Sequence, residues 1–79
     1  MQLFIKTLTS IFPSFYMDIE QTDTILFLKS KIHEEKNIPI ESQKILYAGK
    51  LLEDKKTFKD YNIDKNEGYI ILRIMKKIQ

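Results

Sequence analysis

The sequence contains no cysteine and no tryptophan, and only two glycines and two prolines among its 79 residues. Without cysteine there can be no disulfide framework, so hydrophobic packing must hold the fold together. The same absence fits a reducing compartment, and we expect the cytoplasm and the nucleus. No apolar run approaches the roughly 18 residues of a membrane span. Gln2 and Lys6 interrupt the N-terminal apolar pattern, so we expect no secretory signal and no membrane association.

Neither sign of charge dominates. Thirteen Lys and Arg residues against eleven Asp and Glu leave a net charge of +2. The basic residues are scattered, apart from the pairs Lys55–Lys56 and Lys76–Lys77, and Arg73 is the single arginine. Proteins that bind nucleic acid usually show a dense basic stripe with residues that read the bases. We therefore expect no direct binding to nucleic acid.

The residue types that carry catalysis are sparse. His33 is the single histidine, and no nucleophile or metal co-ligand lies at a suitable spacing from it. The carboxylates of Glu34–Glu35 and of Glu53–Asp54 are neighbours in sequence and so point apart, which does not suit a two-carboxylate site. Gly49-Lys50 lacks the other residues of a phosphate loop. We expect no enzyme activity, cofactor or metal, and we interpret His33 as an exposed helix residue.

Alternation of apolar and polar residues predicts two strands near the N-terminus. In residues 1–9, Leu3 and Ile5 should face the core, with Gln2, Phe4 and Lys6 outward. In residues 14–20, the inward positions are Phe15, Met17 and Ile19. The connection between the strands ends in Pro13, which cannot donate a ladder hydrogen bond and so belongs in a turn. The two strands should pair as an antiparallel hairpin.

A helix is predicted to begin after Thr24, whose hydroxyl can accept a hydrogen bond from the first turn. It should end near Lys36, because Asn37 can adopt the left-handed conformation and Pro39 prevents continuation. One apolar stripe at helical spacing should face the sheet: Ile25, Leu28 and Ile32.

The second half of the sequence predicts three further strands. Residues 45–47 and 50–52 are short strand candidates, joined by a tight turn at Ala48-Gly49. Residues 57–61 should form a helical turn, and 69–74 are nearly all apolar, as in a central strand. The pattern predicts one α+β domain over residues 1–75, with 76–79 as a lysine-containing tail or the start of a linker.

Three segments at fixed distances resemble ubiquitin: MQLFIKTLT at 1–9, Tyr47-Ala-Gly-Lys50 and Asp60-Tyr-Asn-Ile63. The similarity continues in register to about Ile74, with a two-residue insertion near Ile11-Phe12. The resemblance implies a β-grasp fold, in which one main helix packs across a mixed sheet and the first and last strands are adjacent and parallel.

Within that family, residues 43–52 and 60–64 look closest to the N-terminal domain of the radiation-sensitivity, excision-repair shuttle receptors. Those domains dock on proteasomal ubiquitin receptors, so the resemblance implies a non-catalytic, monomeric docking module in protein degradation and DNA repair. The alternatives are a ubiquitin-like modifier, or the ubiquitin-like domain of a different adaptor or co-chaperone. Conjugated relatives require a C-terminal Gly-Gly, whereas this sequence reads Met75-Lys-Lys-Ile-Gln79. We therefore do not expect conjugation.

The resemblance also implies a binding site for ubiquitin-interacting helices, formed by an apolar sheet patch with a basic rim. The matching residues are Leu8, Leu46 and Gly49, with Lys44 and Lys50 on the rim. Two registers are open for the last strand. Counting from Ile63 without a gap makes Ile70 and Leu72 the outward positions, and we favour this register; the other exposes Tyr69 and Ile71.

Four apolar residues fall where the chain should meet water: Ile11, Phe12, Leu26 and Phe27. We interpret them as isolated surface residues. A second contact surface is the alternative.

Overall fold

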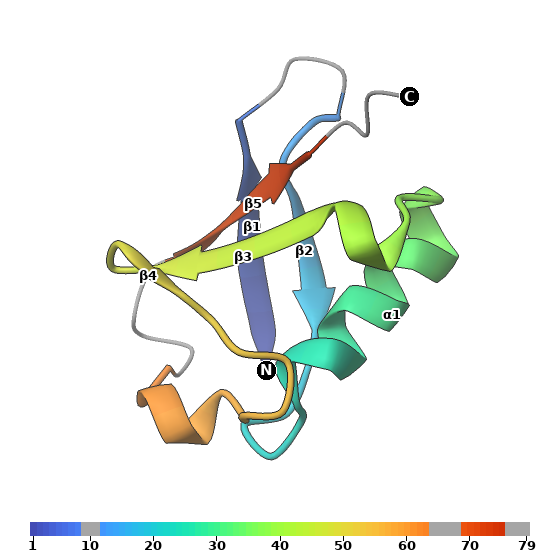
Figure 1. Ribbon diagram of the computed structural model, residues 1–79. Coiled ribbons are helices and arrows are strands. Elements are labelled where there is room, and N and C mark those ends of the chain that lie inside the picture. The colour runs from blue at the N-terminus through green and yellow to red at the C-terminus, as the bar shows by residue number, and fades with distance from the viewer. Residues whose placement is uncertain (9–11, 64–68, 76–79) are drawn as a thin grey trace.

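The first and last strands of the chain lie side by side in the middle of one sheet. The computed structural model describes residues 1–8, 12–63 and 69–75. Along the chain the elements are β1 (Gln2–Thr7), β2 (Phe15–Asp18), α1 (Ile25–Lys36), η1 (Ile40–Ser42), β3 (Gln43–Tyr47), β4 (Lys50–Leu51), η2 (Lys59–Tyr61) and β5 (Tyr69–Ile74). The described strands form a five-stranded sheet in the order β2-β1-β5-β3-β4 (Figure 1).

The pairing directions confirm the predicted topology. β1 pairs antiparallel with β2, as expected for a hairpin, and parallel with β5. β3 pairs antiparallel with both β5 and β4. The α+β, β-grasp architecture expected from the sequence is therefore confirmed.

Both ends of α1 are fixed by the residues predicted to cap it. The hydroxyl of Thr24 accepts a hydrogen bond from the backbone N–H of Phe27, with 3.0 Å between the two atoms. Asn37 has φ 60° in the left-handed region, and its N–H donates to the carbonyl of His33 at 2.9 Å. Of the described helices, none has the length and apolar composition that crossing a bilayer would need.

The predicted apolar stripe of α1 forms the core together with the inward residues of the sheet. Ile25, Leu28 and Ile32 are fully buried, as are Ile5 and Ile45 on the facing strands. Burying one such side chain contributes about 1.5–3 kcal/mol to folding. The inward and outward positions predicted for residues 1–6 agree with the structure.

The turn between β3 and β4 is confirmed at Ala48-Gly49. Both residues have positive φ, 51° for Ala48 and 77° for Gly49. Two left-handed residues in a two-residue hairpin loop are typical of a type I′ turn, whose twist matches that of the flanking strands.

The favoured register of the last strand was wrong by one residue. Ile70 and Leu72 are 0% exposed and belong to the core, while Tyr69, Ile71 and Arg73 take the outward positions. All four residues from Tyr69 to Leu72 are apolar, so their alternation cannot be read from the sequence. Counting from Ile63 across the connection therefore gave the wrong phase.

Smaller differences concern element ends and one surface residue. β3 begins at Gln43, two residues before the predicted start at 45, and β4 ends one residue before the predicted end at 52. Phe12 is half-buried and packs against the core, so it is not an exposed tip residue. Ile11 lies outside the described residues.

Candidate functional site

The face of the sheet opposite α1 carries a row of side chains across four strands. Ile71 on β5 lies opposite Lys6 on β1 and opposite Leu46 on β3, and Leu46 in turn lies opposite Leu51 on β4. Directly opposed residues point to the same face, with Cβ atoms roughly 4.5–5.5 Å apart. We call these four residues the central row.

Three of the four residues of the central row are apolar, and all three are accessible. Leu46 and Ile71 are half-buried, while Leu51 is 53% exposed. Their core-side neighbours Ile45 and Leu72 are completely buried. This contrast shows that Leu46 belongs to the outward set of β3, as the resemblance implied.

Leu8 directly follows β1 and is 62% exposed. It comes two residues after Lys6 of the central row, so the alternation of β1, continued by one residue, places it on the same face. The structure therefore leaves both predicted apolar contact residues, Leu8 and Leu46, accessible to a partner.

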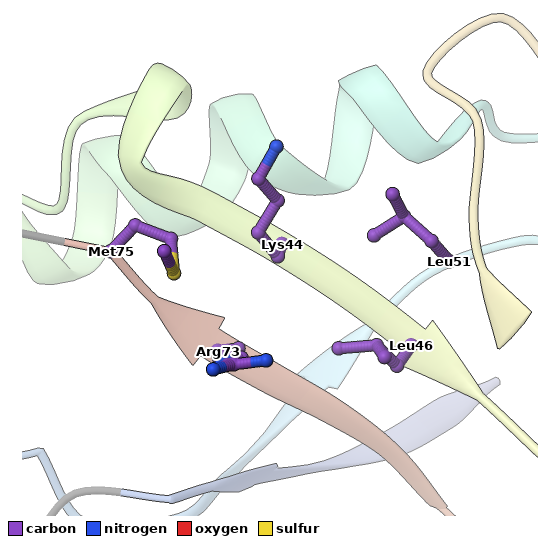
Figure 2. A pocket seen from close by; sticks show the side chains of 5 residues that line it. All are labelled: Lys44, Leu46, Leu51, Arg73 and Met75. Atoms are coloured by element: carbon purple, nitrogen blue, oxygen red, sulfur yellow. The ribbon is translucent and has the colours of Figure 1, made fainter. Parts of the chain in front are cut away.

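Beside the central row, two cations stand opposite each other. Lys44 on β3 is the registered partner of Arg73 on β5, and both side chains are exposed. They border a surface hollow of about 280 Å³ lined by Lys44, Leu46, Leu51, Arg73 and Met75 (Figure 2). Lys44 was expected on this surface from the sequence, whereas Arg73 was not, because the favoured register of β5 turned Arg73 inward.

Gly49 and Lys50 occupy the turn and the start of β4, at the edge of the sheet. Both are exposed. Lys50 is registered opposite Tyr47, which alternates with Leu46 and faces the other side of β3. Lys50 is therefore the neighbour of Leu51 along β4, but it points to the other face of the sheet and does not belong to the central row.

A second row, which the sequence analysis did not single out as a site, consists of three aromatic residues. Phe4 on β1 is registered opposite Tyr16 on β2 and opposite Tyr69 on β5. The ring centroids of Phe4 and Tyr16 are 4.9 Å apart, and the ammonium of Lys6 lies 5.5 Å from the centroid of Tyr69. The outward position of Phe4 in the alternating N-terminal segment was the available signal.

The described residues do not assemble a metal site. Within residues 1–8, 12–63 and 69–75, no three His, Asp or Glu side chains lie together as metal ligands would. His33 is exposed on α1, as predicted. Asp54, one of the paired carboxylates considered above, forms an ion pair with Lys29.

One carboxyl group away from this surface has a shifted pKa. The backbone N–H of Thr57 donates to Oδ2 of Asp60 at 2.9 Å and lowers the pKa of that carboxyl below its usual value. In return, the N–H of Asp60 donates to the Thr57 hydroxyl at 3.2 Å. This reciprocal pair is a capping box at the start of a short helical turn, which indicates a structural role.

Comparison with known proteins places nearly the whole chain in one family. Residues 3–78 match the profile of the Ubiquitin family. The chain is 37% identical over 75 residues to the UV excision repair protein RAD23 homolog B of Homo sapiens, covering 91% of this chain. It is 42% identical over 65 residues to the NEDD8-like protein RUB3 of Arabidopsis thaliana, covering 82% of this chain.

The chain covers very different shares of the lengths of these relatives. The match covers 18% of human RAD23 homolog B, and the same share of the Mus musculus protein. It covers 81% of RUB3. The similarity to RAD23 therefore concerns one ubiquitin-like domain of a much longer protein.

Proposed function

The chain belongs to the ubiquitin family, and from this premise we propose that it is a non-catalytic docking module whose outward sheet face binds helical segments of protein partners. The observation that carries the proposal is the central row with Leu46 in its middle. Apolar side chains at accessible positions on three adjacent strands suit an amphipathic helix that lays its apolar face on them.

The size of the surface suits reversible binding. An interface confined to the central row, Leu8 and the adjacent hollow falls in the class of transient contacts, below about 1,200 Å² of total buried area. A micromolar dissociation constant corresponds to about 8 kcal/mol, which allows a bound partner to be released.

We further propose that the partners are proteasomal ubiquitin receptors, in the manner of the shuttle receptors that the sequence resembles. The similarity to RAD23 homolog B, a protein named for UV excision repair, supports a role in protein degradation and DNA repair. The same proposal implies that the protein is located in the cytoplasm and the nucleus. The module would act as a monomer, without cofactor, and without direct contact to nucleic acid or membrane.

The test is titration with a fluorescently labelled ubiquitin-interacting helical peptide, followed by anisotropy. Leu46→Asp should abolish binding, because it places a charge in the middle of the apolar row. Leu26→Asp is the matched control, since Leu26 is 44% exposed on α1 and lies outside the proposed surface. Circular dichroism must show that both variants fold. Unchanged binding by folded Leu46→Asp would overturn the proposal.

A covalent modifier is the second candidate, favoured by the similarity to RUB3 over most of that protein. A modifier should form a thioester when it is incubated with a ubiquitin-family activating enzyme and ATP. Gel electrophoresis with and without a reducing agent detects that bond. We expect none, because residues 76–79, where conjugated relatives carry paired glycines, are Lys-Lys-Ile-Gln.

A further inference from the structure

β2 forms one edge of the sheet and presents backbone groups on its outer side. Among the described strands, β1 is its single neighbour (Figure 1). Met1 and Ile19 exchange two backbone hydrogen bonds, of 2.7 and 2.8 Å, and so form a hydrogen-bonded pair. In an antiparallel ladder such pairs alternate with pairs that are not bonded. By this alternation the N–H and C=O groups of Tyr16 and Asp18 point away from β1.

Two lysines of α1 border this edge. The ammonium of Lys31 donates to the carbonyl of Asp18, one of the outward-pointing groups. The ammonium of Lys36 lies 4.7 Å from the ring centroid of Phe15, at the other end of β2. Five helical residues rise about 7.5 Å, and three strand residues span about 10 Å. The two cations are therefore spread along most of the length of β2.

Both cations lack a counter-charge within the described parts of the chain. Glu35 precedes Lys36 and is exposed, but it forms no ion pair with either lysine there. The ion pairs between described residues join Met1 to Asp18, Lys29 to Asp54 and Lys56 to Glu53. The ammonium groups of Lys31 and Lys36 are therefore available to carboxylates of another molecule.

The contact of Lys31 with Asp18 takes the place of a missing strand. An added strand would donate a backbone N–H to the same carbonyl. Lysine on an edge strand is one of the means by which proteins limit unwanted strand pairing. An incoming strand displaces the ammonium from this neutral carbonyl. A carboxylate on that strand then offers Lys31 a stronger, charge-assisted hydrogen bond, so an acidic strand is favoured over a neutral one.

We infer that the free edge of β2 accepts an extended segment of a partner protein as a further strand, with acidic side chains at alternate positions that bind Lys31 and Lys36. Side chains of an added strand alternate between the two faces of the sheet. Those on the face of α1 meet the two lysines and the half-buried Phe15. Those on the outward face meet Tyr16, which is 65% exposed and suits β-branched neighbours.

This occupant is distinct from the other possible ones. A second copy of the chain does not fit, because pairing β2 with its own copy would bring Lys31 and Lys36 against the same cations. The inference is also independent of the docking function proposed above. The edge is built by β2 and α1, whereas the central row lies on the outward face of β1, β3, β4 and β5.

The experiment titrates a synthetic peptide of alternating Asp and Val into isotopically labelled protein and follows the amide signals by NMR. The comparison peptide alternates Asn and Val. We expect the acidic peptide to shift the signals of Tyr16 and Asp18 and to bind more tightly than the Asn peptide. Only alternate residues of an added strand bond to the edge. N-methylation at all Asp or at all Val positions should therefore abolish binding in one case and be tolerated in the other.

Lys31→Met should weaken binding of the acidic peptide about tenfold, because a charge-assisted hydrogen bond is lost. Binding of the Asn peptide should be unchanged or stronger, since the carbonyl of Asp18 is released. Lys55→Met is the matched control, because Lys55 is exposed in the loop between β4 and η2 and its loss changes the net charge equally.

Three results would overturn the inference: no shift at β2, equal losses for both peptides in Lys31→Met, or the same effect of both methylation patterns. Leu46→Asp should bind the acidic peptide like wild type. The outcome at the edge of β2 is therefore distinguishable from that of the helical peptide on the central row.

Discussion

The ammonium of Lys29 lies 2.6 Å from Oδ1 of Asp54 and joins α1 to the loop after β4. The side chain of Lys29 is 11% exposed, whereas that of Asp54 is 46% exposed. The lysine therefore depends on its partner far more than the aspartate does. The carbonyl of Lys29 also accepts a hydrogen bond from the amide of the buried Gln43 at 3.0 Å, so α1 is connected to β3 at the same residue.

This asymmetry predicts that Asp54→Asn destabilises the fold more than Lys29→Met. Removing Asp54 leaves a largely buried ammonium without its counter-charge, at a cost of about 1–3 kcal/mol in unfolding free energy. Lys29→Met keeps an apolar side chain of similar length and leaves a carboxylate that water can reach. Urea unfolding of the two variants and of their double mutant measures the difference. Equal losses of unfolding free energy in Asp54→Asn and Lys29→Met would show that the difference in burial does not determine the cost of breaking this ion pair.

The turn at Ala48-Gly49 offers a stabilising substitution. Ala48 adopts a left-handed conformation, with φ 51°, that side-chain-bearing residues rarely take without strain. Asn tolerates this conformation and is preferred before Gly in type I′ turns, so Ala48→Asn should raise the free energy of unfolding by about 0.5–1 kcal/mol.

Gly49→Ala is the opposing control for the turn. A Cβ at Gly49 would meet no atom within 4 Å, so the expected loss of about 1 kcal/mol comes from the positive φ alone. Urea unfolding measures both variants. A destabilised Ala48→Asn variant would contradict the turn assignment.

The lowered pKa of Asp60 predicts a pH-dependent contribution to stability. Its carboxylate is stabilised by the N–H and the side chain of Thr57, so folding favours the ionised form. Such a group contributes fully at pH above its unfolded-state pKa, about 4, and the contribution is lost as the pH falls through the lower folded-state value. Asp60→Asn should therefore be less stable than wild type at pH 7.

The difference between Asp60→Asn and wild type should shrink as the pH falls below about 4, where wild-type Asp60 also becomes neutral. Denaturant unfolding over a pH series measures it. Glu34→Gln, on the exposed surface of α1, controls for the loss of one negative charge. A stability difference that stays constant down to the lowest pH would exclude the proposed linkage.

The two apolar contact residues should contribute unequally to docking. Leu46 is half-buried between two registered neighbours, and Leu46→Ala should cost about 2 kcal/mol or more of binding free energy. Leu8 is 62% exposed and lies at the end of β1, so Leu8→Ala should cost less. Calorimetric titration with the helical peptide compares them. If Leu8→Ala lost more binding free energy than Leu46→Ala, the centre of the interface would lie closer to β1.

The repulsion between Lys44 and Arg73 predicts that Arg73→Met stabilises the isolated domain. Removing one of two directly opposed like charges should raise the unfolding free energy by about 0.2–1 kcal/mol. The gain should decrease at high salt, because both side chains are exposed and screened. Thermal unfolding at low and high ionic strength tests this. A stability loss that does not depend on salt would indicate that the arginine packs rather than repels.

Local patterns were sufficient for α1 and β1. The stripe of α1, its caps at Thr24 and Asn37, and the alternation of Leu3 and Ile5 each depend on residues close in sequence. The outward position of Leu46 came from the resemblance instead, because Ile45, Leu46 and Tyr47 are all apolar and their alternation alone does not say which face is outward. Spacing and capping are therefore adequate wherever one face of an element is polar.

Other features were not predictable, for two physical reasons. From Tyr69 to Leu72, β5 is apolar on both faces, so its period of two is hidden there, and Ile70, Leu72 and Arg73 were assigned to the wrong sides. Lys29 and Gln43 are polar residues buried by partners distant in sequence. No local pattern reveals such partners, because burial of a polar group depends on the tertiary contacts that satisfy it.

The position of β5 determines when this fold can form during protein synthesis. Its pairing with β1 joins residues such as Phe4 and Tyr69, which are translated near the start and near the end of the domain. Until β5 leaves the ribosome, β1 and β3 have no strand between them, and the apolar surface of α1 has an incomplete sheet to cover. The domain must therefore complete its folding after nearly all of it has been made, through contacts of large sequence separation that form slowly.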